Sequence, residues 1–133
     1  MAELNNAEEA FIDLFIKKDK QERYRFKLAG KKHRKEMLDS LNHHLDFRED
    51  RALKLKACER NHDWILNSLK NVGTANACNL IADGCELDGE RLDLEEGVNI
   101  LLTNPWGTIL ICDQPRCAFY KEEDPGDMYL FQK

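Results

Sequence analysis

Apolar residues recur at different spacings along this chain, and each spacing predicts a type of secondary structure. Near the N-terminus, Asn5 or Asn6 can cap a helix, and Glu9 follows Asn6 by three positions as in a capping box. Apolar side chains then recur at helical spacing: Ala10, Phe11, Leu14 and Phe15. This pattern predicts a first helix that runs to about Lys17.

The spacing changes to two from residue 21 onward. Tyr24, Phe26 and Leu28 alternate there with Arg23, Arg25 and Lys27. A period of two places successive side chains on opposite faces of a strand. We therefore expect a strand that ends at Gly30, with its apolar side chains facing the core and its cations facing outward.

Two more helices are expected before the middle of the chain. Residues 31–45 carry a stripe of apolar residues at helical spacing: Met37, Leu38, Leu41 and Leu45. Residues 58–71 carry a similar stripe, and Gly73 follows it as a stop signal. Residues 46–57 stay ambiguous, because Leu53 and Leu55 alternate as in a short strand while the flanks suit a loop or a helical turn.

The second half of the chain combines one helix with several strands. Residues 74–82 are rich in apolar side chains and predict a strand, and Asp88-Gly89 predicts a turn. Asp93 can then cap a fourth helix, with Glu96 at the capping-box position. Three β-rich runs follow at 108–113, 116–122 and 128–132, separated by short turns.

The short turns favour a C-terminal three-stranded antiparallel meander. Together with the strands expected earlier, it predicts an α+β fold in which an antiparallel sheet packs against about four helices. The 133 residues suit a single globular domain over 1–133 that buries its core without metal or disulfide cross-links.

Composition adds an expected location to this picture. The chain is 42% hydrophobic and 34% charged, has no long apolar run, and begins with an acidic segment that does not resemble an export signal. Its five cysteines are odd in number and irregular in spacing. These features predict a cytosolic protein with reduced cysteines, no membrane span and no cofactor. Cys112 and Cys117 flank a turn and could lie opposite each other across a hairpin, where a disulfide is the less favoured alternative to two buried thiols.

Charge is strongly segregated along the chain. Residues 17–35 contain ten Lys or Arg against two acids, although the whole protein has a net charge of −5. The predicted anion-binding residues lie in this segment: Arg23, Arg25, Lys27, Lys31, Lys32, Arg34 and Lys35. Four of these cations crowd an expected helix start, where backbone N–H groups already favour an anion. The competing interpretation is a solvated face whose cations pair with the protein's own acidic residues.

The charge pattern leads to a hypothesis about the partner. An acidic protein surface is favoured over nucleic acid, because the rest of the chain is acidic and no aromatic residue is expected to be free to stack on a base. Self-association through the opposed charges is a further possibility. The pattern indicates a non-catalytic binding or regulatory protein. The alternative is an enzyme for a phosphorylated or nucleotide substrate, with Asp113 or His44 transferring a proton.

Other chemistry is poorly supported by the sequence. Cys58 and His62 have an i, i+4 spacing that suits metal chelation, but two ligands do not make a site. The acidic stretch from Asp83 lacks the oxygen ligands that a calcium loop requires at its third and fifth positions. No glycine-rich phosphate loop or hydrolase motif is present. The sequence thus predicts no metal site and no catalytic group.

Overall fold

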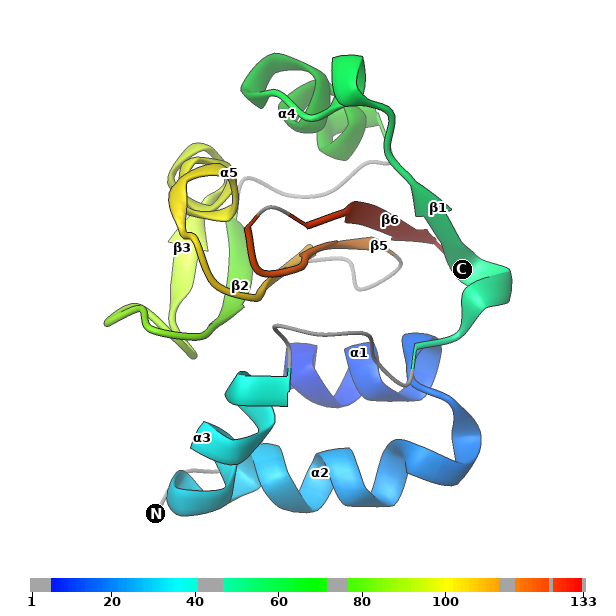
Figure 1. Cartoon of the computed structure of the whole chain (residues 1–133), viewed down its shortest axis with the longest axis vertical. Helices are drawn as coiled ribbons and strands as arrows, with labels where there is room; N and C mark the ends of the chain where they lie inside the picture. Colours follow the sequence, from blue (N-terminus) through cyan, green and yellow to red (C-terminus); the bar gives the residue numbers. More distant parts are fainter. Residues whose placement is uncertain (1–5, 41–46, 72–76, 113–116, 125, 133) are drawn as a thin grey trace.

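The computed structural model describes residues 6–40, 47–71, 77–112, 117–124 and 126–132 (Figure 1). Within these ranges the chain forms five α-helices: α1 (Asn6–Phe15), α2 (Gln21–Ala29), α3 (Lys31–Ser40), α4 (His62–Asn71) and α5 (Leu94–Thr103). It also forms six strands: β1 (Ala52–Lys54), β2 (Ala77–Ala82), β3 (Arg91–Asp93), β4 (Thr108–Cys112), β5 (Cys117–Lys121) and β6 (Met128–Gln132). The predicted α+β class is confirmed.

All six strands join one antiparallel sheet in the order β1-β6-β5-β4-β2-β3. Strands β4, β5 and β6 pair in sequence order, which confirms the predicted C-terminal meander. Strand β3 pairs with β2, and α5 then leads the chain back to β4 on the other side of β2. The short strand β1 forms the opposite edge, beside β6.

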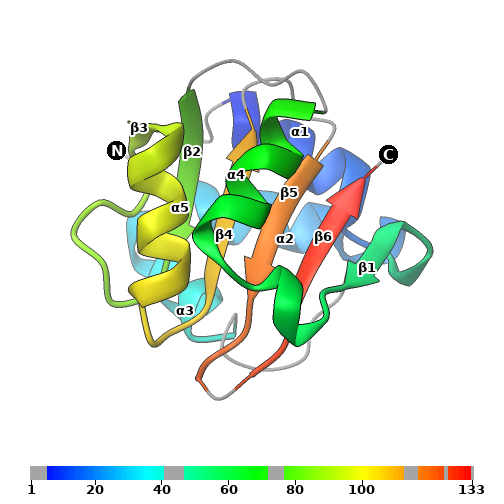
Figure 2. The ribbon, with the colours of Figure 1, turned by 90° about the horizontal axis from the view of Figure 1, so that it is seen from above.

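Helices cover both faces of the sheet. Figures 1 and 2 show α1, α2 and α3 on one face and α4 and α5 on the other. Side chains alternate between two apolar clusters: Ile109 and Ile111 face α1, whereas Leu110 and Cys112 face α4 and α5. Because both faces are covered, every residue of β4 and β5 is buried. The sheet therefore separates the α1–α3 layer from the α4–α5 layer.

The strand expected at residues 21–28 is wrong, since this segment is helix α2. Tyr24 and Leu28 are both buried, and a separation of four positions puts them on one side of a helix as well as on one face of a strand. Phe26 lies between them and points outward, with 64% of its surface exposed. The remaining residues of α2 are mainly good helix formers, so the short apolar alternation did not determine the secondary structure.

Several boundaries also differ from the sequence-based expectation. Helix α1 ends at Phe15, and α4 begins at His62 because a 3₁₀ turn at Ala57–Glu59 precedes it. Helix α3 is described as far as Ser40, and the predicted positions Leu41 and Leu45 lie outside the described residues. The ambiguous segment contains the short strand β1.

The capping and cysteine predictions agree with the structure. Asp93 caps α5, where its Oδ1 accepts a hydrogen bond of 2.8 Å from the backbone N–H of Glu96. None of the five cysteines is in a disulfide. Cys112 and Cys117 do face each other at the β4–β5 hairpin, with their sulfur atoms 3.0 Å apart. In the described ranges, no helix is both long and apolar enough to cross a lipid bilayer.

Candidate functional site

The predicted cations lie on or beside two consecutive helices, α2 and α3. Gly30 has an extended backbone and separates the two helices. Phe26 of α2 and His33 of α3 hold the exposed sides of these helices together, with ring centroids 5.0 Å apart. We call the exposed and partly exposed side chains of these two helices the α2–α3 surface. Its principal members are Arg23, Arg25, Phe26, Lys27, Lys32, His33 and Lys35.

Arg34 belongs to the interior rather than to this surface. Its guanidinium donates to Oε2 of Glu8 at 2.8 Å and to both carboxylate oxygens of Asp88 at 2.8 and 3.0 Å. Burial lowers the pKa of Arg34, but the hydrogen bonds to Asp88 and Glu8 outweigh it and raise that pKa above its usual range. This cation pairs with the protein's own acids, which is what the competing interpretation of the charged segment expects.

Two other cations have weaker internal partners. Arg25 forms an ion pair with Asp13 of α1 at a partly exposed position. The ammonium nitrogen of Lys27 lies 3.8 Å from the Glu36 carboxylate, which is itself half exposed. Exposed ion pairs of this kind contribute little to stability. Arg25 and Lys27 therefore still add positive charge to the electrostatic field at this surface.

Three cations remain open to solvent. Arg23, Lys32 and Lys35 are exposed, and within the described part of the chain no ion pair involves them. The position of Lys31 is at the start of α3, and its side chain is outside the description. Of the seven predicted residues, Arg34 is therefore internal and the side chain of Lys31 is not described, while Arg23, Arg25, Lys27, Lys32 and Lys35 remain on the candidate surface. Phe26 adds an aromatic group that the sequence did not place there.

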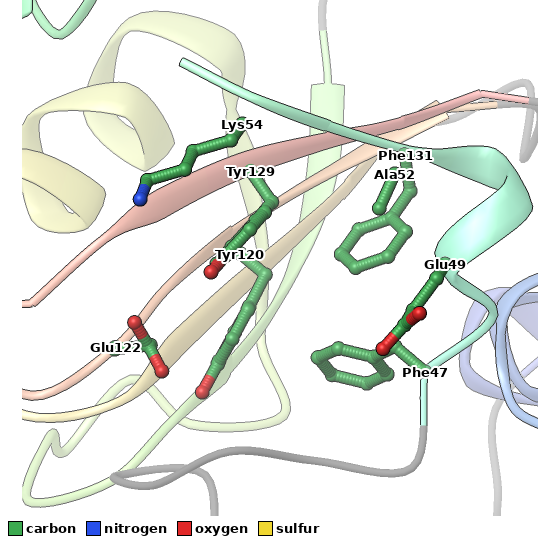
Figure 3. A pocket seen from close by; sticks show the side chains of 8 residues that line it. All are labelled: Phe47, Glu49, Ala52, Lys54, Tyr120, Glu122, Tyr129 and Phe131. Atoms are coloured by element: carbon green, nitrogen blue, oxygen red, sulfur yellow. The ribbon is translucent and has the colours of Figure 1, made fainter. Parts of the chain in front are cut away.

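A second candidate site was missed from the sequence. A cavity of about 220 Å³ opens on the α1 side of the sheet, and Figure 3 shows the eight side chains around it. We call it the aromatic pocket. Its lining residues are Phe47, Glu49, Ala52, Lys54, Tyr120, Glu122, Tyr129 and Phe131.

Strand register places most of these side chains on one face. Lys54, Tyr129 and Tyr120 are successive partners across β1, β6 and β5, and Ala52 pairs with Phe131 in the next row. Phe11 and Phe15 of α1 pack against Phe131. The pocket thus lies beside α1, over the edge of the sheet where β1 joins β6.

The segment that carries Phe47 closes one side of the pocket. Phe47 forms an isolated antiparallel bridge with Ile16, and the N–H of Arg48 donates to the Phe15 carbonyl at 2.7 Å. These contacts hold the Phe47 ring against Tyr120 and Phe131, with both centroid distances 4.8 Å. The only sequence signal for this site was the presence of aromatic residues at alternate positions in β6, Tyr129 and Phe131.

The phenols of the pocket stay protonated at neutral pH. Burial, with a smaller contribution from the negative charge of Glu122, raises the pKa of Tyr120 far above its usual range. The same two causes raise the pKa of Tyr129. Neither hydroxyl is therefore suited to act as a general base, and both remain hydrogen-bond donors.

The groups named for catalysis and metal binding can be compared with the structure only in part. Within the described ranges, no cluster of three or more His, Cys, Asp or Glu side chains is arranged to hold a metal ion. His62 lies beside Asp63, with Nδ1 3.6 Å from the carboxylate. Asp113 and His44, the proton-transfer groups of the enzyme hypothesis, lie outside the described residues.

Comparison with known proteins found no match to a protein family, to a curated protein or to a solved structure. The fold defines the class of the molecule as an α+β protein with helices on both faces of an antiparallel sheet. Its exposed surfaces and its cavities are therefore the features that bear on its function.

Proposed function

We propose that this is a non-catalytic binding protein that engages an acidic partner protein through the α2–α3 surface. The observation that carries the proposal is Phe26, which is 64% exposed and lies within the basic segment. Arg23 and Lys27 are three positions before and one position after it on the same helix. An aromatic anchor bordered by charged side chains is typical of the residues that dominate protein interfaces.

Electrostatics favours an acidic partner. Segment 17–35 has an excess of eight positive charges. The cation of this segment that pairs most closely with acidic side chains of the protein is Arg34, which lies away from solvent. The exposed Arg23, Lys32 and Lys35 keep their charge available to a partner. Complementary charge accelerates the encounter of the two proteins and orients the complex. The ring of Phe26 becomes buried in the complex and supplies contact area.

Single-stranded nucleic acid is the second candidate, and Phe26 is the reason to retain it. An exposed aromatic ring beside cations can stack on an unpaired base while the cations contact phosphates. The acidic character of the rest of the chain works against a long polyanion, so the acidic protein remains the first choice.

The test is capture of partners from lysate by purified variants. We expect Phe26→Ala and the triple charge reversal Arg23→Glu, Lys32→Glu, Lys35→Glu each to reduce capture by about tenfold or more, because each removes an anchor or the complementary charge. The captured protein is identified by mass spectrometry, and its surface should be acidic.

Matched controls come from exposed residues elsewhere. Leu53→Ala removes another exposed apolar side chain, and Lys70→Glu reverses an exposed cation on α4. Both controls should capture as the unmodified protein does, and thermal unfolding of all variants should stay within about 2 °C. Undiminished capture by the α2–α3 variants refutes the assignment of this surface.

A further inference from the structure

We propose that the aromatic pocket is a binding site for a small organic cation, namely an alkylated or quaternary ammonium ion. The pocket shares no residue with the α2–α3 surface. The two sites also prefer opposite charge, because the α2–α3 surface is basic. The proposal is therefore independent of the partner proposed above.

The aromatic rings supply the attraction for a cation. Tyr120 and Tyr129 lie nearly parallel, with an interplanar angle of 14° and centroids 6.1 Å apart, and Phe131 follows at 6.4 Å from Tyr129. Phe47 closes the group by contacting Tyr120 and Phe131. Phe47, Tyr120 and Phe131 are buried and Tyr129 is partly exposed, so an ion in the cavity lies against Tyr129 with the other three rings behind it. Aromatic faces carry partial negative charge, and groups of such rings bind quaternary ammonium ions.

The charged side chains around the pocket reinforce this preference. Figure 3 shows the carboxylates of Glu49 and Glu122 on opposite sides of the rings. Within the described residues, neither carboxylate has a cationic partner. Lys54, the one cation of the lining, already pairs with Asp127 at 3.2 Å. The Asp127 carboxylate is shared with Arg60, so we count Lys54 at full charge. Two carboxylates and one ammonium group still give the lining a net negative charge, which attracts a cation and repels an anion.

Size and donor chemistry restrict the ligand further. The cavity of about 220 Å³ is smaller than the roughly 300–1,000 Å³ of sites that enclose drug-sized molecules, so it suits a ligand of a few heavy atoms. Aromatic walls do not replace the water shell of a metal ion, which requires several oxygen or nitrogen ligands. An alkylated ammonium ion is weakly hydrated and apolar on its surface, and it matches both the rings and the charge.

The experiment is an NMR titration of the intact protein with choline and with neohexyl alcohol, its neutral analogue in which carbon replaces the quaternary nitrogen. Choline should perturb amide shifts in β5 and β6 and bind about tenfold or more tightly than the alcohol, because only choline gains the cation–π and carboxylate attraction. The anionic analogue tert-butylacetate, which is the carboxylate 3,3-dimethylbutanoate, should bind more weakly than either compound.

Four substitutions test whether choline binding depends on the aromatic face and the carboxylate or only on apolar packing. Tyr129→Leu keeps apolar bulk without a π face, and it should abolish the preference for choline, whereas Tyr129→Phe should retain it. Glu122→Gln should weaken choline binding about threefold or more without changing alcohol binding. The local structure is kept, since the amide oxygen can still accept the 2.9 Å hydrogen bond from the Asp127 N–H. Glu123→Gln, at a neighbouring acid outside the pocket, should change neither affinity.

Three outcomes overturn the proposal. These are equal affinity for choline and the neutral alcohol, affinity for tert-butylacetate as high as for choline, and no shift at the pocket up to about 50 mM choline. A peptide that carries trimethyllysine distinguishes the source of the ion. Peptide binding about tenfold tighter than choline assigns the ammonium group to a protein side chain, and equal or weaker binding assigns it to a free small molecule.

Discussion

Gly97 shows how one residue determines the distance between an element and the sheet. It lies inside α5 and is buried where the helix packs on β2 and β4. A Cβ atom there would lie 2.7 Å from Leu110 Cδ1 and still closer to the Cys78 sulfur. Glycine in a helix interior is usually unfavourable, so its presence at this position reflects the close approach of α5 to the sheet.

Gly97→Ala should therefore destabilise the protein, although the same change at an exposed helical position stabilises. We expect a loss of about 1–3 kcal/mol in the free energy of unfolding, because overpacking outweighs the gain of up to about 1 kcal/mol in helix propensity. Urea denaturation measures the difference.

Asn99→Ala, at an exposed position of the same helix, is the control for helix propensity. It should leave the free energy of unfolding unchanged or raise it slightly. Adding Cys78→Ala to Gly97→Ala should recover part of the loss, since it removes the nearest atom. A Gly97→Ala protein as stable as the original would show that α5 can move away from the sheet without cost.

At the scale of elements, Arg34 ties together three segments that are distant in the sequence. It joins α3 to Glu8 of α1 and to Asp88 in the β2–β3 connection. Asp88 Oδ1 also accepts a hydrogen bond of 2.9 Å from the backbone N–H of Ala82 at the end of β2. The network thus fixes the α3 helix relative to the sheet edge.

Arg34→Met should cost about 3–5 kcal/mol in the free energy of unfolding, because it removes a hydrogen-bonded cation from the Glu8 carboxylate, which is only 1% exposed. Chemical denaturation at pH 7 measures the loss. Adding Glu8→Gln should recover a large part of it, since the buried charge is then removed. A single variant that loses less than about 1 kcal/mol would show that water reaches Glu8 when the cation is absent.

At the scale of the whole molecule, the sheet places the basic segment and an acidic layer, formed by α4 and α5, on opposite faces, although Asp88 of the β2–β3 connection lies beside α3. The basic segment 17–35 belongs to the α1–α3 layer. The exposed acids Asp63, Glu95 and Glu96 belong to α4 and α5 on the opposite face. A partner that contacts only the α2–α3 surface therefore avoids most of the acidic layer, whereas a long polyanion that wraps the molecule meets it.

A titration of the protein with single- and double-stranded DNA and RNA at about 0.1 M salt should show no binding at micromolar concentration or tighter, because the acidic layer repels an extended polyanion. Fluorescence anisotropy of labelled oligonucleotides provides the measurement. Tight binding whose log affinity falls with log salt at a slope near −5, as about six phosphate contacts to duplex DNA predict, would instead identify a nucleic-acid-binding protein.

Local patterns were sufficient for several parts of the fold. The Asp93 cap, the short turns of the C-terminal meander and the free cysteines depend on residues close in sequence or on overall composition, so a single sequence reveals them. The same holds for the α+β class, which needs only the number and kind of elements.

Local patterns were insufficient where two interpretations share the same spacing. Tyr24 and Leu28 fit a strand face and a helix side equally well, and the helix-forming residues around them together with the packing of α2 against α1 and α3 favour the helix. In the helix, Phe26 points outward and provides the aromatic group of the α2–α3 surface.

The sequence by itself determined the charge segregation, the class of fold and the order of its C-terminal strands, because these follow from composition and from contacts between neighbours in the chain. Only the tertiary structure decided that Arg34 is internal and that Phe47 joins the rings of β5 and β6. Arg34 meets Asp88, 54 positions away. Such contacts arise when distant segments are packed together, and no local spacing specifies them.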